Sequence, residues 1–169
     1  NPEDEESARP HLAGFVVKEI FHEPSNWRAR ESLDGFLARC GVPGIAGLDT
    51  RALVRRIRDG GFQNGVLSTD PARQDADGLV RAAREAPPLD GRDLVAGVTT
   101  REPYRWSEGL WNGIDGQIPR APRPAPRLRV VAYDFGVKRN ILRLLVEQGF
   151  DVTVVPAATP AAEVLRHEP

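Results

Sequence analysis

The sequence predicts an α/β protein whose last part begins a parallel, doubly wound sheet. One observation is a nearly continuous apolar run at 128–133, followed by a helical pattern and a second apolar run at 151–155. Such runs are typical of strands that are buried on both faces of a sheet. The other is a proline- and arginine-rich stretch at 117–129, which separates this pattern from residues 1–116. We expect the second domain to stop before it could hold a complete active site.

Bulk composition restricts the class of protein. The chain has 169 residues, with 40% hydrophobic and 28% charged residues, which is ordinary for a globular protein. Its formal net charge of −1 gives no field that would recruit nucleic acid or an anionic membrane. No apolar run reaches the length of about 18 residues that a membrane span needs. A single cysteine excludes a disulfide framework and a cysteine-based metal site, which favours a cytoplasmic location.

The start of the chain, Asn1 to Glu6, has neither an initiator Met nor a signal peptide, and this suggests an excised or truncated piece. Its acidic residues predict a solvated loop. The run between His11 and Phe21 is rich in branched and aromatic residues and predicts a strand. Ser32 is a suitable N-cap for a helix that reaches Cys40, and Gly41 stands at its stop position.

Residues 44–100 alternate between helical and extended patterns. Asp49 and Thr50 offer a cap for a helix that Gly60 and Gly61 end, with Leu53, Val54 and Ile57 on one face. Three further predictions follow along the chain. They are a turn at Asn64 and Gly65 leading into an extended Val66–Leu67, a helix over 79–85 capped by Asp75, and a loop over 89–100 with one short strand.

Residues 117–129 hold four prolines and four arginines, which predicts a stiff, extended linker. We place the domain boundary at 117–127, between a domain at 1–116 and a second one at 128–169. The basic side chains leave an anionic partner open, but a solvated spacer is the more ordinary explanation.

The second domain has a β-α-β-α pattern. The first strand, 128–133, is followed by a turn at 134–136 and a helix over 138–148. We expect a second strand at 151–155 and a further helix that begins at Thr159 and Pro160. The residues that we expect to face inward from the first helix are Ile141, Leu142, Leu144 and Leu145. Ligands of such sheets bind beyond the carboxyl ends of the strands, where residues 134–140 lie.

Three tempting motifs carry little chemistry. Cys40 lacks the flanking glycines of a nucleophile elbow, so a structural thiol is favoured. His167 and Glu168 form a histidine–carboxylate pair, but they end a short helix, where histidine is common for dipole reasons. The triplet at 134–136 has the letters of the kinase metal-binding motif without the upstream elements that kinases need. No two histidines have metal-ligand spacing.

A fourth feature is the segment at 130–141. It places Asp134, Lys138, Arg139 and Asn140 where a strand ends and a helix begins. A helix N-terminus beside two cations favours an anionic group. A capped helix start with solvated charges explains the same residues, and the sequence leaves both readings open.

The segment VVAYDFGVKRNILRLL (130–145), followed by GFDVTVVPA (149–157), closely resembles the start of the glutamine amidotransferase domain in the small subunit of carbamoyl-phosphate synthetases. Independent stretches upstream resemble the N-terminal domain of the same family. They are SNWRARESLDGFL (25–37), GIAGLDTRALVRRIRDGGFQNGVL (44–67) and DLVAGVTT (93–100). The resemblance implies an incomplete N-terminal α/β small-subunit domain and the first two βα units of a class I glutamine amidotransferase domain.

The resemblance implies that the intact subunit hydrolyses L-glutamine to glutamate and ammonia through a Cys nucleophile assisted by a His and a Glu. The ammonia passes to a large subunit, which uses ATP and Mg²⁺ to make carbamoyl phosphate for arginine and pyrimidine biosynthesis. The family's nucleophile elbow and His–Glu pair correspond to positions beyond Pro169, so no catalytic residue and no cofactor is assigned to this chain, and we expect no glutaminase activity from it alone. Candidates for proximity to the site are Asp134, Gly136, Lys138 and Asn140, with Lys138 in a supporting electrostatic role.

Two other functions remain open. Residues 1–116 could act as a non-catalytic module that docks a larger partner subunit. The loop at 134–140 could instead serve a free-standing phosphate- or nucleotide-binding protein, although the glycine fingerprints of such proteins are absent from the sequence.

Overall fold

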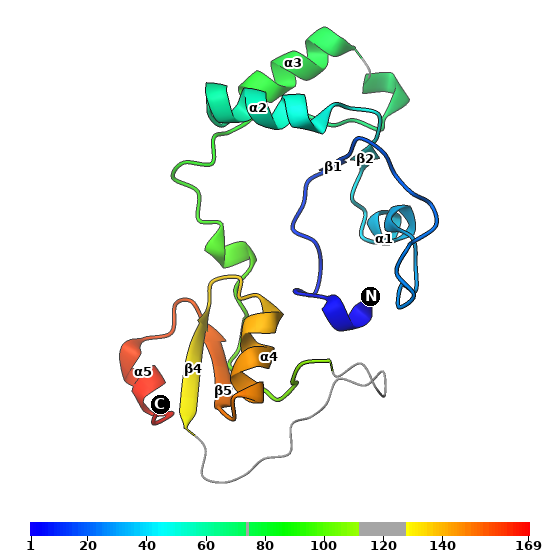
Figure 1. Cartoon of the computed structure of the whole chain (residues 1–169). Coiled ribbons are helices and arrows are strands. Elements are labelled where there is room, and N and C mark those ends of the chain that lie inside the picture. The colour runs from blue at the N-terminus through cyan, green and yellow to red at the C-terminus, as the bar shows by residue number, and fades with distance from the viewer. Residues whose placement is uncertain (74, 112–127) are drawn as a thin grey trace. The chain divides into compact units, whose positions relative to one another are not determined.

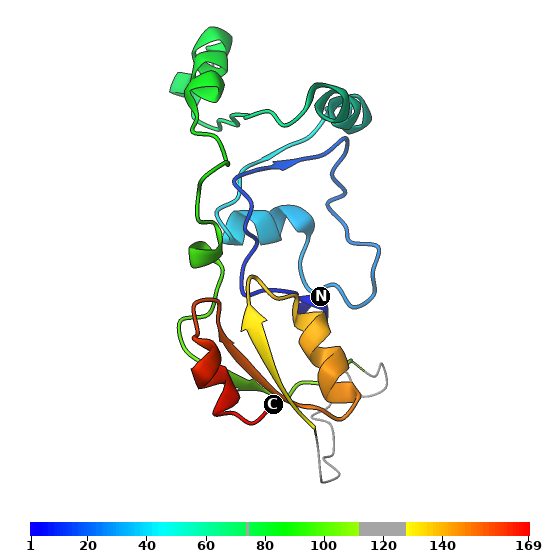
Figure 2. The same cartoon turned by 90° about the vertical axis from the view of Figure 1, so that its left-hand side faces the viewer.

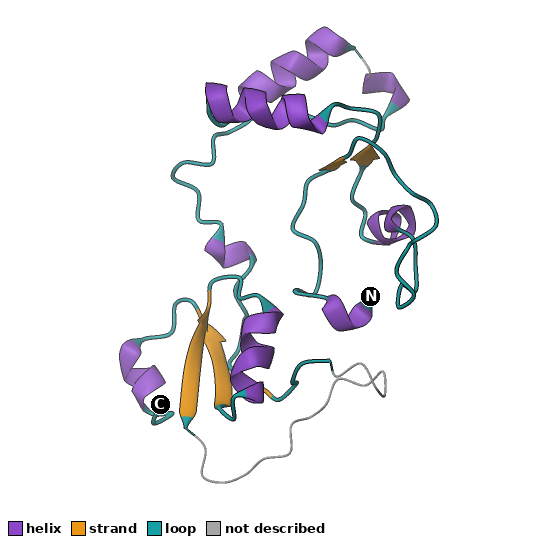
Figure 3. Cartoon of the chain, viewed as in Figure 1, coloured by secondary structure: helices purple, strands orange, loops and turns teal. Residues whose placement is uncertain are grey.

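The computed structural model describes residues 1–73, 75–111 and 128–169, and it is an α/β chain with two small sheets (Figures 1 and 3). Its contacts divide it into two compact units. Unit 1 consists of Asn1 and residues 9–92, and unit 2 consists of residues 2–8 and 93–169. The linker predicted at 117–127 lies outside the described residues. Residues 93–111, which precede that linker, have their contacts in unit 2.

Unit 1 begins its first α-helix as the sequence predicts. Helix α1 (Leu33–Arg39) has Ser32 as N-cap, whose hydroxyl accepts a hydrogen bond from the Gly35 N–H at 3.3 Å. It ends at Cys40, and Gly41 follows with a φ of +67°, a conformation that glycine adopts without steric cost. The helix buries Leu37.

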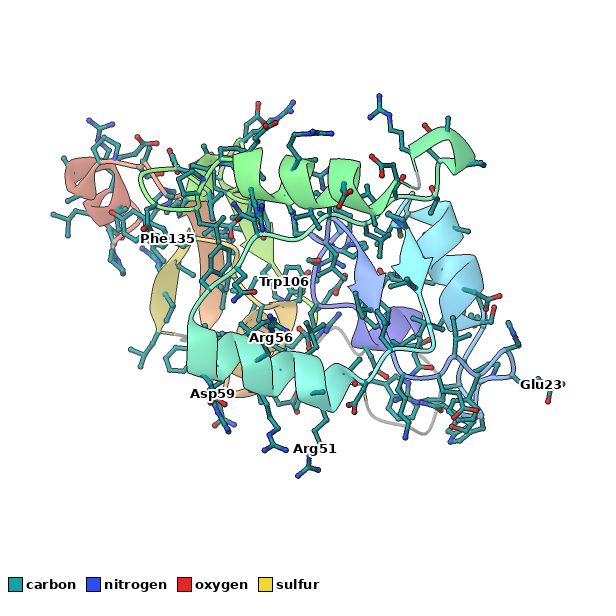
Figure 4. The ribbon with its side chains drawn as sticks, turned by 90° about the horizontal axis from the view of Figure 1, so that it is seen from above. Glu23, Arg51, Arg56, Asp59, Trp106 and Phe135 are labelled. Atoms are coloured by element: carbon teal, nitrogen blue, oxygen red, sulfur yellow. The ribbon has the colours of Figure 1, made fainter. Side chains whose placement is uncertain are left out.

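The next two helices also start at their predicted caps. Asp49 accepts a hydrogen bond from the Ala52 N–H at 2.9 Å and begins α2 (Thr50–Gly60). Asp75 accepts bonds from the Asp77 and Gly78 N–H groups and begins α3 (Ala76–Glu85). Arg51 and Asp59 project from one side of α2 (Figure 4).

Extended structure before residue 101 is much shorter than predicted. The strand expected between His11 and Phe21 is reduced to β1 (Phe15–Val16), which pairs in parallel with β2 (Gly44–Ile45). Val66–Leu67 belongs to no strand, and the loop at 89–100 contains the 3₁₀-helix η3 (Val95–Gly97) instead of a strand. Branched residues form a strand only where a neighbouring strand supplies hydrogen bonds. Among the described residues, few residues of these runs pair with another strand. Two other short 3₁₀-helices are η1 (Pro2–Asp4) and η2 (Pro71–Arg73).

Unit 2 contains the predicted β-α-β-α pattern. Its elements are β4 (Arg129–Asp134), α4 (Arg139–Glu147), β5 (Asp151–Pro156) and α5 (Ala161–Leu165). Strands β4 and β5 run in parallel, from Arg129 opposite Asp151 to Asp134 opposite Pro156. An unpredicted strand, β3 (Tyr104–Trp106), pairs antiparallel with the other edge of β5, so the order is β3-β5-β4.

The core of unit 2 lies between α4 and β5. Leu142 and Val146 of α4 pack with Val152 and Val154 of β5, and none of these side chains is more than 4% exposed. The strands lie between α4 and α5 in both views of the ribbon (Figures 1 and 2). Each helix thus covers one side of the sheet, which is the arrangement that a parallel sheet needs.

The inward face of α4 differs from the prediction. Ile141 and Leu144 are 51% and 45% exposed, whereas Leu142, Arg143 and Val146 are buried. The buried positions are spaced by three and four residues and so form one helix face. Arg143 is on this face because residues 2–8 lie against α4, where its guanidinium donates to the Glu5 carbonyl at 3.2 Å.

The start of α5 also differs. Its N-cap is Pro160, without a side-chain hydrogen bond, so Thr159 is not the cap that the sequence suggested. The Thr159 carbonyl instead accepts a hydrogen bond from the Tyr133 hydroxyl at 3.1 Å. A side chain of β4 therefore fixes the loop that follows β5. In the part of the chain that the structure describes, no helix is long and apolar enough to cross a membrane.

Candidate functional site

The carboxyl edge of β4 and β5 is the first place to look for a site in a parallel sheet. Strand β4 ends at Asp134, whose side chain is 7% exposed. One carboxylate oxygen accepts hydrogen bonds from the N–H groups of Gly136 and Val137, both at 2.9 Å. The other accepts from the Thr100 N–H at 2.7 Å. Three backbone donors thus satisfy this buried carboxylate.

The end of β5 is fixed by the same neighbouring segment. The Ala157 N–H donates to the Thr99 hydroxyl at 2.9 Å. Because Asp134 and Pro156 are paired across the two strands, Thr99 and Thr100 contact both strand ends side by side.

Gly136 stands in the turn between β4 and α4. Its φ is +91°, in the left-handed region, and a Cβ added there would lie 3.2 Å from the Val98 side chain. Both the conformation and the close approach favour glycine. The turn therefore packs tightly against the segment that carries Thr99 and Thr100.

The N-terminus of α4 holds an anionic group that comes from the chain itself. A Glu6 carboxylate oxygen accepts a hydrogen bond from the Asn140 N–H at 2.8 Å, and the Glu6 carbonyl accepts one from the Arg139 N–H at 3.2 Å. Lys138 lies 3.8 Å from the other Glu6 oxygen, and Arg139 lies 3.9 Å from Glu5. The acidic start of the chain is thus bound to this helix end, where the macrodipole favours negative charge.

These contacts show what each of the four candidate residues from the sequence does in the structure. Asp134 and Gly136 form the turn, the Asn140 backbone is capped by Glu6, and Lys138 is an exposed residue that pairs with Glu6. Their proximity to a substrate remains a prediction. No local pattern indicates that Glu6, Thr99 and Thr100 belong to this edge, because each acts through a contact with residues far along the chain.

Tyr104 on β3 shares this electrostatic environment. Burial raises the pKa of its phenol, and the negative charge of Asp134 raises that pKa further, while Arg139 opposes the shift. The carboxylate of Asp134 therefore influences a side chain of the antiparallel strand, although its own hydrogen bonds go to backbone groups.

The other candidate residues, Cys40, His167 and Glu168, have no described partners that would support catalysis or metal binding. Cys40 is a partly buried free thiol at the end of α1. The His167 carbonyl accepts a bond from Arg129 at 3.5 Å, and Glu168 forms an ion pair with the same arginine, so both residues are used to hold the chain after α5. Among the residues with described positions, no group of three or more His, Cys, Asp or Glu could hold a metal ion.

Unit 1 contains an apolar groove of about 550 Å³. It lies between the β1–β2 pair and the chain at 65–69, and its lining includes Val16, Ile45, Leu53 and Leu79. No titratable side chain is among the lining residues, so the groove offers no acid–base chemistry.

Known proteins resemble the chain over its whole length. Residues 1–67 match the family described as carbamoyl-phosphate synthase small chain, CPSase domain. The carbamoyl phosphate synthase small chain of Syntrophotalea carbinolica is 54% identical over 169 residues, which are 100% of this chain and 44% of that protein. Along its full length the chain is therefore similar to carbamoyl phosphate synthase small chains.

Two further small chains have similar identity and coverage. That of Thioalkalivibrio sulfidiphilus is 52% identical over 169 residues, covering 100% of this chain and 44% of the relative. That of Ruegeria pomeroyi is 48% identical over 169 residues, covering 99% of this chain and 43% of the relative. The chain therefore spans less than half the length of the small chains that it matches.

Proposed function

We propose that this chain is part of a glutamine-hydrolysing small subunit of carbamoyl phosphate synthase. The observation that carries the proposal is the 54% identity to a protein of that name over all 169 residues. In this role the intact subunit releases ammonia from L-glutamine, and a large subunit uses the ammonia with ATP and Mg²⁺ to form carbamoyl phosphate. The product would supply arginine and pyrimidine biosynthesis in the cytoplasm.

In this proposal residues 128–169 form the first two βα units of the glutamine amidotransferase domain. The parallel pairing of β4 and β5 around α4 supports it. Residues 1–116 belong to the N-terminal domain of the small subunit, and 117–127 form the linker.

The loop at 134–140 would then form one wall of the glutamine pocket. It lies at the carboxyl end of β4, where ligands of parallel sheets bind. Its described contacts suit a supporting role, since Asp134 and Glu6 both accept hydrogen bonds from backbone N–H groups there. Covalent attack on an amide needs an activated nucleophile with an adjacent base, and Cys40 has neither His nor carboxylate among its described hydrogen bonds.

Glutamate release tests this proposal directly. We expect a small subunit that carries this sequence to release glutamate from glutamine and to support carbamoyl phosphate synthesis when its large subunit is present. We expect the 169-residue chain alone to release no glutamate above buffer, and Cys40→Ser to leave that result and the activity of the subunit unchanged. Loss of subunit activity in Cys40→Ser, or turnover by the chain alone, would contradict these assignments.

A second candidate function is a non-catalytic docking module for a large partner subunit. One observation favours it: the apolar face of α2 is exposed, with Leu53, Val54 and Ile57 at 41%, 63% and 38%. Such a stripe normally packs against another element. Copurification of the 169-residue chain with the large subunit, weakened by Val54→Asp and not by Arg51→Asp, would support this function. Retention of both variants would argue against it.

A further inference from the structure

The segment at 98–100 contacts the ends of both parallel strands of unit 2. The Thr100 N–H binds Asp134 at the end of β4, and the Thr99 hydroxyl binds the Ala157 N–H just after β5. These two contacts join residues that are 34 and 58 positions apart in the sequence. We call the segment 98–100 with these two bonds the clasp.

The clasp is anchored on both sides. Before it, Val98 packs so close to Gly136 that a Cβ there would lie 3.2 Å from the valine side chain. After it, the Thr100 hydroxyl donates to the Glu102 carbonyl at 2.9 Å, and β3 then pairs with β5. Trp106 on β3 packs against the core of α4 and β5. The segment therefore has little freedom to move away from the strand ends.

Asp134 makes the clasp dependent on charge. Its carboxylate is buried, and a buried charge is tolerated only when it is well hydrogen-bonded. Two of its three donors lie in the turn that leads to α4, and the third is Thr100. The same side chain thus sets the path of the 134–140 loop and its distance from the clasp.

We propose that Thr99 and Asp134 are positioning residues that fix the carboxyl edge of β4 and β5, and that the clasp forms the rim of the glutamine pocket. The kinetic part of this inference rests on the proposed function. Neither residue reacts with glutamine. Asp134 acts through the turn that leads to α4, and Thr99 acts on the end of β5 and, through the adjacent Thr100, on Asp134. The resulting orientation of the loop at 134–140 decides how well the pocket wall fits the substrate.

A matched pair of variants isolates the clasp. Thr99→Ser keeps the hydroxyl that accepts from Ala157, whereas Thr99→Val keeps the shape and removes the acceptor. We expect faster exchange of the Ala157 amide hydrogen in Thr99→Val and normal exchange in Thr99→Ser, measured on the small subunit in complex with its large subunit. Asp134→Asn, which removes the charge, should accelerate exchange at the Thr100 amide.

The kinetic measurement uses the same complexes. We expect kcat/KM for glutamine to fall about tenfold in Thr99→Val, mainly through KM, because a misplacement of about 1 Å can cost roughly 100-fold and the loss of one hydrogen bond should displace the loop by less. Thr99→Ser should restore it. Synthesis of carbamoyl phosphate from added ammonia should not change, which separates a local defect in the pocket from general destabilisation.

The outcomes are distinguishable. Unchanged exchange at Ala157 in Thr99→Val would overturn the clasp. Faster exchange with an unchanged kcat/KM, or an equal loss of the ammonia-dependent reaction, would overturn the positioning role. An unmodified small subunit that hydrolyses no glutamine would refute the proposed function and the kinetic role with it, while the exchange at Ala157 would still decide whether the clasp exists.

Discussion

Units 1 and 2 are stabilised in different ways. Unit 2 buries Leu142, Val152, Val154 and Val155 completely, whereas the buried hydrophobic residues of unit 1 are Leu37 and Val42, at 6% and 8% exposure. The helices of unit 1 begin at caps that act over two or three residues. In unit 2, two hydrogen bonds at the strand ends join residues 34 and 58 positions apart, in addition to the local bonds from Gly136 and Val137 to Asp134. Local signals thus form the helices of unit 1, and long-range contacts form unit 2.

The variant with the largest expected effect on this difference creates a cavity in the core of unit 2. Leu142 is fully buried against β5, so Leu142→Ala should lower the free energy of unfolding of unit 2 by about 2–5 kcal/mol. Leu53, at 41% exposure on α2, is the matched leucine of unit 1, and Leu53→Ala should cost less than about 1 kcal/mol. Urea unfolding followed by tryptophan fluorescence in a Trp27→Phe background, where Trp106 and Trp111 of unit 2 are the reporters, measures unit 2. Equal losses in the two variants would remove the contrast between the units.

The caps of unit 1 give an intermediate effect. Asp75 accepts from two N–H groups at the start of α3, so Asp75→Ala should destabilise that helix by about 1 kcal/mol. Asp75→Asn keeps an acceptor and should cost less. Helix content by circular dichroism, with amide exchange at Gly78, measures the change. Asp59→Ala, near the end of α2, is the control and should leave α3 unchanged.

The sequence predicted the features that depend on neighbouring residues. Ser32, Asp49 and Asp75 are recognisable as caps because a cap side chain and the N–H group that donates to it lie within one turn. The strands β4 and β5 were recognised from continuous apolar runs, since burial on both faces leaves that pattern. The apolar run of β4 and the helical pattern after it also place residues 134–140 at a strand end.

The missed features depend on distant partners. Strand β3 has only three residues and exists because β5 offers a free edge. Arg143 is buried in place of Ile141 and Leu144 because residues 2–8 lie against α4, and no local periodicity indicates such a contact. The run around Phe15 shows the opposite error. Its strong strand propensity predicts a strand between His11 and Phe21, but only Phe15 and Val16 pair with another strand. Pairing between distant segments decides these cases, and propensity is a weak guide to it.

The acidic segment at 2–8 sharpens the comparison, because it lies at the start of the chain and belongs to unit 2. Glu6 serves α4 in two ways: its carboxylate caps the Asn140 N–H, and it pairs with Lys138. Glu6→Gln keeps an acceptor oxygen and removes the charge, whereas Glu6→Ala removes both. We expect a loss of about 0.5 kcal/mol in Glu6→Gln, since partly exposed ion pairs contribute little, and a larger loss in Glu6→Ala.

Salt separates the two contributions of Glu6. At about 1 M salt, charges are screened over roughly 3 Å, so the cost of Glu6→Gln should vanish while that of Glu6→Ala persists. Urea unfolding of unit 2 at low and high salt measures both, and Glu147→Gln, at the exposed far end of α4, is the control. If the cost of Glu6→Ala also vanished in salt, the segment would be held by charge alone, and the bond to the Asn140 N–H would have no part in placing residues 2–8 in unit 2.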